Sequence, residues 1–319
     1  MDRTHLVKVK SYANIAIIKY WGKADADKMI PSTSSISLTL DNMFTETQAI
    51  FISSETALAE RGVEGDLFYL NGVLQDQKQH DKISKVIDLF REDQSQYVKI
   101  DTFNNMPTEA GLSSSSSGLS AVIKACNELF EKDLSQKELA QISKYGSGSS
   151  SRSFFGPLAA WDKDTGEIYP VETDLKLAMI MLVLTDQKKP ISSRDGMKLC
   201  METSTNFEQW VKQSEQDFIA MKAYLRANDF QKVGELTEAN ALFMHATTRH
   251  ATPSFSYLTE ASYQAMEKVK SLRQEGHRCY FTMDAGPNVK VLCLEEDLDQ
   301  LASILSKDYH IIVSKTKEL

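Results

Sequence analysis

The chain has 319 residues, a formal net charge of -8, 42% hydrophobic residues and 25% charged residues. This is ordinary globular composition, and the length suits one large domain or two ordinary ones. The acidic balance argues against a general nucleic-acid binder, because such binding needs clustered Lys and Arg that neutralise phosphates. It is compatible with a small anionic ligand, since a local basic pocket can lie on an acidic protein.

The cysteines and apolar runs bear on the compartment. Cys126, Cys200, Cys279 and Cys293 show no CxxC spacing, which indicates reduced, mostly buried thiols in a cytosolic protein. The first ten residues, MDRTHLVKVK, contain no apolar core, so no secretory signal is expected. The longest apolar run, 177–184, is too short to span a bilayer and suits a buried strand. We therefore expect a cytoplasmic protein with no membrane partner.

The first third of the chain is rich in strand patterns. VKVK and SISLTL alternate between apolar and polar residues, and Asn71-Gly72 in LFYLNGVLQ predicts a two-residue hairpin turn. Helical spacing of apolar residues predicts a helix over 81–92, and YVKIDTFNN predicts another strand. An amphipathic helix is expected to begin at the end of a run of serines, followed by a second helix from Ser135, where Glu138 completes a capping box.

The second half has a different order of elements. A buried strand at 177–184 leads into a long helical stretch over 195–275, which Gly276 closes as a C-cap. Strands at 279–283 and 289–294 flank the turn DAGPN, and a helix near 297–306 precedes a last strand, HIIVS. This β-α-β-β-α-β order is typical of a ferredoxin-like half. We predict an N-terminal half over 1–175 and a C-terminal half over 176–319.

The serine run lies in PTEAGLSSSSSGLSAV, residues 107–122. One interpretation is a flexible Ser/Gly linker. The other is a phosphate loop, because a strand precedes the run and a strong helix follows it. In that geometry the backbone N–H groups and the positive end of the helix dipole face an anion. The run matches neither GxxxxGK[ST] nor GxGxxG, so the pattern alone leaves both interpretations open.

Four further stretches combine polar side chains with buried or glycine-rich sequence. They are SYANIAIIKYWGK (11–23), YGSGSSSRSFFGPLAAW (145–161), TDQKKPISSRDGM (185–197) and FTMDAGPNV (281–289). An arginine among hydroxyls suits a carboxylate or phosphate. The ordinary alternatives are an exposed strand face, a surface arginine, a solvated loop and a β-turn aspartate. The histidines show no metal-ligand spacing, and the absence of GxSxG argues against a serine hydrolase.

Together, these five stretches resemble the GHMP small-molecule kinase superfamily, and within it the mevalonate diphosphate decarboxylase family, over essentially the whole chain. The superfamily loop Pro-x-x-x-Gly-Leu-Gly-Ser-Ser is similar to the segment that begins at Pro107, with Ser113 in place of the second glycine. The decarboxylase branch often has alanine there. NIAIIKYWGK and DAGPN are more characteristic of that branch than of its sibling kinases.

The resemblance implies an α+β, GHMP-kinase-like fold. Its N-terminal mixed αβ half would be of the ribosomal S5 domain 2 type, with a deep cleft between it and the ferredoxin-like half. It also implies ATP-dependent conversion of (R)-5-diphosphomevalonate to isopentenyl diphosphate, CO₂, ADP and phosphate, after phosphorylation of the 3-hydroxyl, in the mevalonate pathway. ATP and Mg²⁺ are the implied cofactors, and a homodimer is the implied assembly.

The same resemblance assigns roles to individual residues. The implied catalytic residues are Asp284, Arg152, Asn14 and Lys188, with Lys189 as the alternative to Lys188. The implied contacts to substrate are Tyr20, Lys23, Ser147, Ser149, Arg152, Ser193 and Arg194, with Ser192 as the alternative to Ser193. The implied nucleotide contacts are Pro107, Gly111, Leu112, Ser113, Ser114, Ser115 and Ser116, and Ser115 is the implied Mg²⁺ ligand.

Two alternatives stay open at this stage. One is a related kinase or decarboxylase that acts on mevalonate or phosphomevalonate. The other is a non-catalytic binding member of the fold, against which Asp284, Arg152 and the phosphate loop argue.

Overall fold

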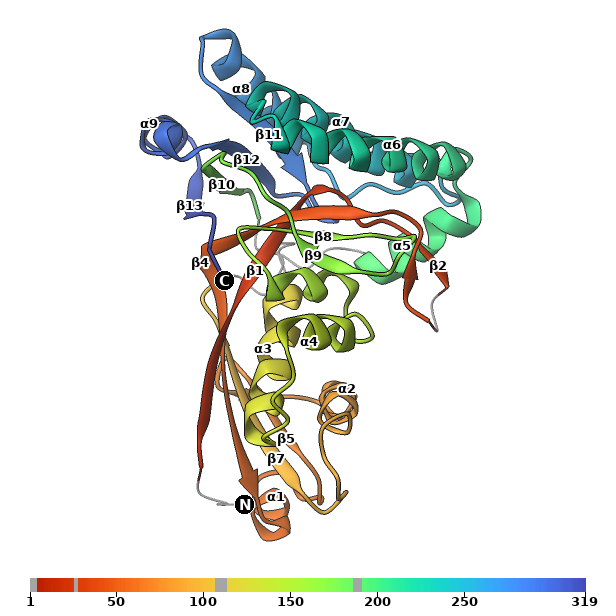
Figure 1. The fold of residues 1–319 in the computed structure, drawn as a ribbon, viewed down its shortest axis with the longest axis vertical. Coiled ribbons are helices and arrows are strands. Elements are labelled where there is room, and N and C mark those ends of the chain that lie inside the picture. Colours follow the sequence, from red (N-terminus) through yellow and green to blue (C-terminus); the bar gives the residue numbers. More distant parts are fainter. Residues whose placement is uncertain (1–4, 26–27, 107–113, 186–190) are drawn as a thin grey trace.

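The computed structural model describes residues 5–25, 28–106, 114–185 and 191–319. Figure 1 shows two αβ halves stacked along the long axis, with the N-terminal half below and the C-terminal half above. The first half contains β1 (Val7–Ile18), β2 (Lys23–Asp25), β3 (Ile30–Pro31), β4 (Ser35–Ile52), α1 (Ser54–Arg61), β5 (Leu67–Leu70), β6 (Val73–Leu74), α2 (Gln77–Ile87), β7 (Tyr97–Asn104), α3 (Ser114–Leu129), α4 (Gln136–Ser143), the 3₁₀ helix η1 (Gly148–Phe154), β8 (Leu158–Trp161) and β9 (Ile168–Pro170).

The second half follows in chain order. It contains β10 (Leu177–Val183), α5 (Ser193–Thr203), α6 (Phe207–Arg226), α7 (Phe230–Arg249), α8 (Glu260–Gln274), β11 (Cys279–Met283), β12 (Val289–Leu294), the 3₁₀ helix η2 (Glu295–Asp297), α9 (Leu298–Leu305) and β13 (His310–Lys315). Among the helices that the structure describes, none is long and apolar enough to cross a membrane.

The N-terminal sheet is organised around the long strand β4. In the described chain the sheet has the strand order β6-β5-β7-β4-β8-β9, and β1 also pairs with β4. Ile36, Leu38 and Leu40 are buried in the core, as the alternation predicts. The intervening Ser35 and Ser37 are buried too, because that face of β4 is covered by η1. A strand whose polar face is also buried can present hydroxyls to an enclosed group.

Local signals predicted several elements correctly. Asn71 and Gly72 form the two-residue turn between β5 and β6, with φ of 51° and 78°, as a type I′ turn requires. Ser135 and Glu138 form the capping box of α4. The helix expected over 81–92 was placed too late: α2 begins at Gln77, because the side chain of Asp76 accepts from the N–H of Gln79 as its N-cap.

The start of α3 corrects a second expectation. The helix was expected after the serine run, but it begins at Ser114. Ser116 and Ser117 are buried in its first turn. Their hydroxyls bond to neighbouring strands, Ser117 Oγ lying 2.7 Å from Thr45 Oγ1 of β4. The described part of the run therefore builds a helix N-terminus and is not a linker.

The C-terminal sheet has the order β11-β12-β10-β13, with antiparallel pairing throughout. This is the strand order of a ferredoxin-like sheet, so the predicted fold class is confirmed. The long helical stretch expected between the first two strands of this half consists of the separate helices α5–α8. Gly276 follows α8 with φ of 99°, and the N–H of His277 bonds to the carbonyl of Leu272, which is a Schellman-type end.

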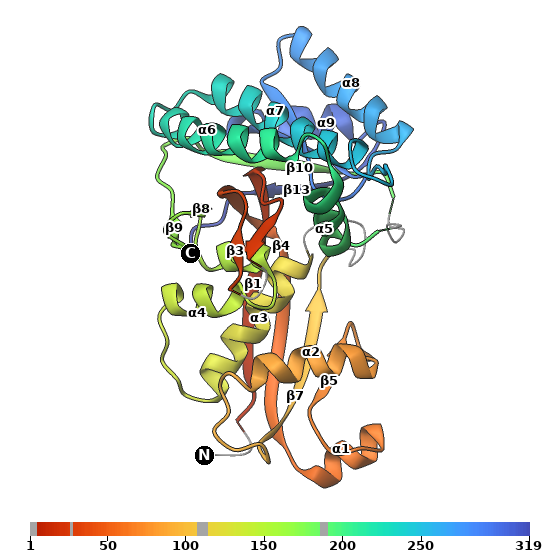
Figure 2. The same ribbon diagram turned by 90° about the vertical axis from the view of Figure 1, so that its right-hand side faces the viewer.

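One apolar cluster spans the two halves. Ile15 of β1, Met179 of β10 and Phe218 of α6 belong to the same buried cluster. β4 also contacts β13, since Asp41 accepts hydrogen bonds from Ser314 Oγ and from the backbone N–H of Lys315, both at 2.9 Å. Figure 2 shows the sheet containing β1 and β4 ending directly below β10 and β13. The residues near this junction are therefore fixed from both halves.

Candidate functional site

Arg152 is the main buried cation of η1. Its side chain is 2% exposed. The guanidinium donates to Ser37 Oγ at 3.0 Å, to Ser35 Oγ, and to Asn14 Oδ1 at 3.4 Å. All three acceptors are neutral, and no described carboxylate lies within ion-pair distance. Burial lowers the pKa of Arg152 to about 10, which leaves it charged at neutral pH. A buried guanidinium with neutral partners is suited to receive a carboxylate or phosphate ligand.

Asn14 holds η1 against β1. It lies where the register between β1 and β4 shifts, and such irregularities often redirect a side chain near a site. Its Nδ2 donates to the carbonyl of Ser149 and to Ser153 Oγ, both at 2.8 Å. The amide of Asn14 is therefore used within the fold, and it orients Arg152 and the serines of η1.

Asp284 lies between two lysines. Its Oδ1 is 2.7 Å from Lys19 Nζ and its Oδ2 is 3.2 Å from Lys290 Nζ. Asp284 is 22% exposed, whereas the lysine side chains are 2% and 0% exposed. Burial acts to raise the pKa of Asp284, but the two ammonium groups outweigh it and hold that pKa well below its usual range. Asp284 is therefore ionised, a weak base, and partly accessible.

Tyr20 and Lys23 both lie within electrostatic reach of Arg194. The Tyr20 hydroxyl is buried without a described hydrogen-bond partner, and its ring packs at a tilt on Trp161 with centroids 5.1 Å apart. Burial raises the pKa of Tyr20 above its usual range, although Arg152 and Arg194 oppose this. Burial also lowers the pKa of Lys23, and the charge of Arg194 adds to the effect.

A close approach of backbone shapes this part of the site. A Cβ on Gly148 would lie 2.8 Å from the ring of Tyr20 and 2.9 Å from that of Trp161. Only glycine therefore lets the start of η1 pack against both rings. Next to it, the hydroxyls of Ser147 and Ser149 lie 3.1 Å apart and are half-buried. The first turn of η1 thus presents two adjacent hydroxyl groups.

The start of α5 brings in the last described group. Ser192 is the N-cap, accepting from the N–H of Asp195 and donating to its carboxylate. Ser193 and Arg194 follow in the first turn, the former half-buried and the latter exposed. Because the hydroxyl of Ser192 is used as a cap, Ser193 is the better candidate of the two for a ligand contact.

The nucleotide contacts are only partly described. Pro107, Gly111, Leu112, Ser113 and Lys188, together with Lys189, lie outside the described residues, and for Ser114 only the helical backbone is described. Ser115 is exposed in the first turn of α3. Ser116 is buried, and its hydroxyl accepts from the backbone N–H of Asn14 at 3.4 Å. Its hydroxyl is thus directed toward β1, so its contribution to an anion site would come from the backbone.

Sequence reasoning missed two residues of this site. Lys19, within the stretch 11–23, received no role, and Lys290 was not singled out. In VKVLCL, Lys290 stands among apolar residues of a strand buried on both faces. That context was a usable signal, because an unpaired lysine is costly in such a strand. The sequence pattern does not show, however, that Asp284 is the partner of Lys290.

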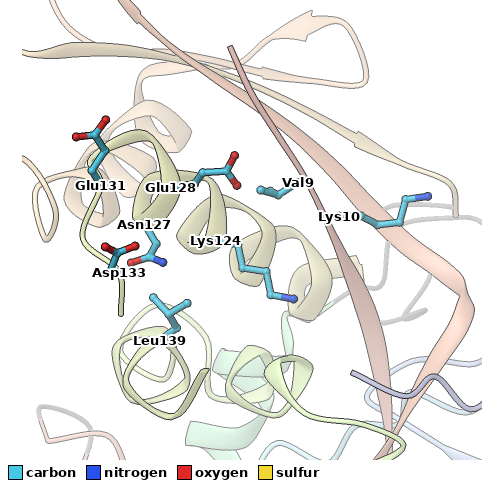
Figure 3. A pocket seen from close by; sticks show the side chains of 8 residues that line it. All are labelled: Val9, Lys10, Lys124, Asn127, Glu128, Glu131, Asp133 and Leu139. Carbon is cyan, nitrogen blue, oxygen red and sulfur yellow. The ribbon is translucent and has the colours of Figure 1, made fainter. Parts of the chain in front are cut away.

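A separate cavity of about 810 Å³ lies away from these residues. Figure 3 shows its lining: Val9 and Lys10 from β1, Lys124, Asn127 and Glu128 from α3, Glu131 and Asp133 from the following turn, and Leu139 from α4. None of the predicted site residues lines it. Its acidic and basic side chains are mostly at the surface, so it is not the place where the candidate chemistry assembles.

Comparison with known proteins places the chain among named relatives. Residues 11–169 match a model of the diphosphomevalonate decarboxylase-like N-terminal domain, and residues 179–318 match the mevalonate 5-diphosphate decarboxylase C-terminal domain. The diphosphomevalonate decarboxylase of Candida albicans is 33% identical over 94% of this chain and 88% of its own length.

Two solved structures are close in fold. The mevalonate pyrophosphate decarboxylase from Streptococcus pyogenes is 66% identical, with a TM-score of 0.93 over 99% of this chain and 98% of that one. A structure of MDDEF in complex with MVAPP, AMPPCP and magnesium is 39% identical, with a TM-score of 0.89 over 98% and 97% of the two chains.

Proposed function

The chain belongs to the diphosphomevalonate decarboxylase family, and we propose how its residues divide the work of that family's reaction. The reaction is the ATP-dependent decarboxylation of (R)-5-diphosphomevalonate to isopentenyl diphosphate, CO₂, ADP and phosphate in the mevalonate pathway. One observation carries the division: among the described residues the buried guanidinium of Arg152 has only neutral hydrogen-bond partners, and near it lies the ionised carboxylate of Asp284. The first can bind an anion, and the second can accept from a hydroxyl.

Arg152 binds the substrate carboxylate in this proposal. Its remaining N–H donors can form a bidentate pair with that group. Asn14, Ser35 and Ser37 hold the guanidinium plane, so they act as positioning residues. For Asn14, for which the family resemblance implies a catalytic role, we propose positioning instead, since its amide is engaged with η1.

Asp284 orients the 3-hydroxyl of the substrate. A carboxylate whose pKa is held well below its usual range is a poor proton acceptor. We therefore assign it a hydrogen bond from the hydroxyl and an electrostatic role. The 3-oxygen bonds to the γ-phosphorus as ADP leaves, and the hydroxyl proton passes to an oxygen of the transferred phosphoryl group, which later departs as hydrogen phosphate. The C3–O bond then breaks with its electron pair on phosphate, and the electron pair of the bond to CO₂ becomes the new double bond.

Tyr20, Lys23, Ser147, Ser149, Ser193 and Arg194 bind the diphosphate. The buried Tyr20 hydroxyl lacks a described partner, and it is suited to donate to a diphosphate oxygen. No described carboxylate pairs with Lys23, whose Nζ lies 3.6 Å from Met29 Sδ. Charge left uncompensated in the protein is available to an anionic ligand.

The first turn of α3 fits a Mg²⁺–nucleotide group. A helix N-terminus offers backbone N–H groups to phosphates, and the exposed Ser115 hydroxyl stands there. No cluster of three or more His, Cys, Asp or Glu in the described part of the chain could hold a metal by itself. This suits Mg²⁺ that is held largely by phosphates. When bound, the ion would neutralise phosphate charge; Ser115 would be its protein ligand, and Lys188 would neutralise the γ-phosphate.

The remaining proposals concern domains, assembly and compartment. We place the boundary between the ATP-binding half and the ferredoxin-like half near residue 175, with the substrate cleft between the halves. We also propose a homodimer in the cytoplasm. The buried, free cysteines are consistent with a reducing compartment. Light scattering of the purified chain tests the dimer, and a monomer at micromolar concentration would contradict it.

Release of CO₂ and phosphate tests the substrate assignment. The purified enzyme is supplied with MgATP and with mevalonate, phosphomevalonate or diphosphomevalonate in parallel. We expect CO₂ from diphosphomevalonate alone, because the proposed cationic and hydroxyl groups are matched to a diphosphate. Comparable CO₂ release from phosphomevalonate would overturn the assignment of Lys23 and Arg194 to the second phosphate.

A further inference from the structure

The charges around Asp284 are not balanced. Two buried ammonium groups, Lys19 and Lys290, flank one carboxylate, and Arg152 is close enough to act on Lys19. His245 of α7 faces the same cluster but adds no charge, because burial lowers its pKa to about 3. Among these described groups, three positive charges therefore stand against one negative charge. Such an excess is costly in a buried site unless an anion joins it.

The geometry gives each oxygen of Asp284 its own cation. Lys19 is fixed independently, since its Nζ also donates to the carbonyl of Ala16 at 2.8 Å. If Lys19 were the only cation in contact with it, the carboxylate of Asp284 could still rotate, because the χ2 torsion of an aspartate has a broad distribution. Lys290 at 3.2 Å from the second oxygen sets the plane. The side chain of Asp284 stays 22% exposed, so a substrate hydroxyl can still approach the carboxylate.

Lys290 is held rigidly in the middle of the sheet. It lies on β12, directly opposite Thr282 of β11 and Met181 of β10, and it is fully buried. An ammonium group on a long side chain usually reaches solvent, but here it is directed at the carboxylate of Asp284 within the core. The fold thus fixes the position of this charge as firmly as that of the strand.

We infer that Lys290 is a positioning residue for the decarboxylation. It fixes the plane of Asp284 toward the substrate hydroxyl, and its charge adds to that of Lys19 in attracting the phosphoryl group to be transferred. The inference rests on the proposed role of Asp284 in the family's reaction. In this arrangement Lys290 is the second cation, beside Lys19, that contacts the carboxylate of Asp284.

The test replaces Lys290 with methionine, which matches its length without the charge. We expect kcat to fall at least tenfold, while the KM for MgATP changes less than threefold.

The groups that face Lys19 from the surrounding elements are Arg152 of η1, His245 of α7, Asp284 after β11 and Lys290 of β12. Burial lowers the pKa of Lys19 to about 8, and Lys290 contributes to this. Its removal should therefore shift the alkaline limb of kcat/KM upward by about one pH unit.

Controls separate this effect from loss of structure. Lys315→Met makes the same change on β13, where the exposed Lys315 pairs with Glu295, and it should leave both kcat and the pH profile unchanged. If Lys290→Met fails to fold, Lys290→Gln keeps a hydrogen-bond donor without the charge. A folded variant with kcat within twofold of wild type, or with an unmoved alkaline limb, would overturn the inference. Failure of the wild type itself to release CO₂ would instead overturn the proposed function.

Discussion

At the scale of single residues, the site depends on charges that the fold holds away from water. Asp284 and Arg152 were expected from the sequence, because their motifs are distinctive. Lys290 was not, because a lone lysine in a strand has no sequence neighbour that reveals its partner. Its contact with Asp284 bridges β12 and the turn after β11. Motifs identified the groups that we propose to touch ligands, whereas the group that we propose to act through one of them required coordinates.

Asp284→Asn tests the carboxylate. The change keeps the shape of the side chain and removes its charge, so Lys19 and Lys290 lose their counter-ion. We expect kcat to fall on the order of 10³-fold, with the KM for diphosphomevalonate little changed. Steady-state kinetics with CO₂ detection measures this, and Asp299→Asn, at an exposed position of α9, is the matched control. A loss below tenfold would exclude Asp284 from the chemistry.

Arg152→Lys tests the planar guanidinium. An ammonium group cannot reach Ser35, Ser37 and a substrate carboxylate together. We expect most activity to be lost while circular dichroism still shows a folded protein. Arg278→Lys, an exposed residue paired with Glu296 and Asp297, should keep full activity. If Arg152→Lys were also fully active, Arg152 would contribute only bulk positive charge.

At the scale of elements, locally determined features were predicted and tertiary ones were not. The turn at Asn71-Gly72 and the capping box at Ser135 depend on neighbouring residues, so their patterns sufficed. The start of α3 within the serine run did not follow from helix propensity, because serine is a poor helix former. It follows from contacts with other strands, such as that between Ser117 and Thr45.

We expect opposite effects from replacing two serines in the first turn of α3. Ser115 is exposed and is the proposed Mg²⁺ ligand, so Ser115→Ala should raise the KM for MgATP or lower kcat without changing the melting temperature. Ser117 is buried and bonded to Thr45, so Ser117→Ala should cost about 1 kcal/mol of stability and leave the KM for MgATP unchanged. Kinetics with varied MgATP, together with thermal melts, distinguishes them. Identical behaviour of the two variants would contradict this division of the serine run.

At the scale of the whole molecule, two αβ halves of different topology share an apolar cluster, and both contribute residues to the candidate site. Arg152 comes from the first half and Asp284 from the second, and Lys19 at the end of β1 joins them. The β-α-β-β-α-β order in the sequence was enough to predict the ferredoxin-like sheet. The contact between β4 and β13 was not predictable, because it pairs residues more than 270 positions apart.

In the proposed reaction, phosphorylation of the 3-hydroxyl and loss of CO₂ are successive steps at one site. The most direct measurement follows ADP and CO₂ simultaneously, with diphosphomevalonate limiting. We predict that one ADP and one CO₂ appear for each diphosphomevalonate consumed, with no phosphorylated product left at the end. Stable accumulation of a 3-phosphorylated product with ADP but without CO₂ would contradict the account and identify the protein as a kinase.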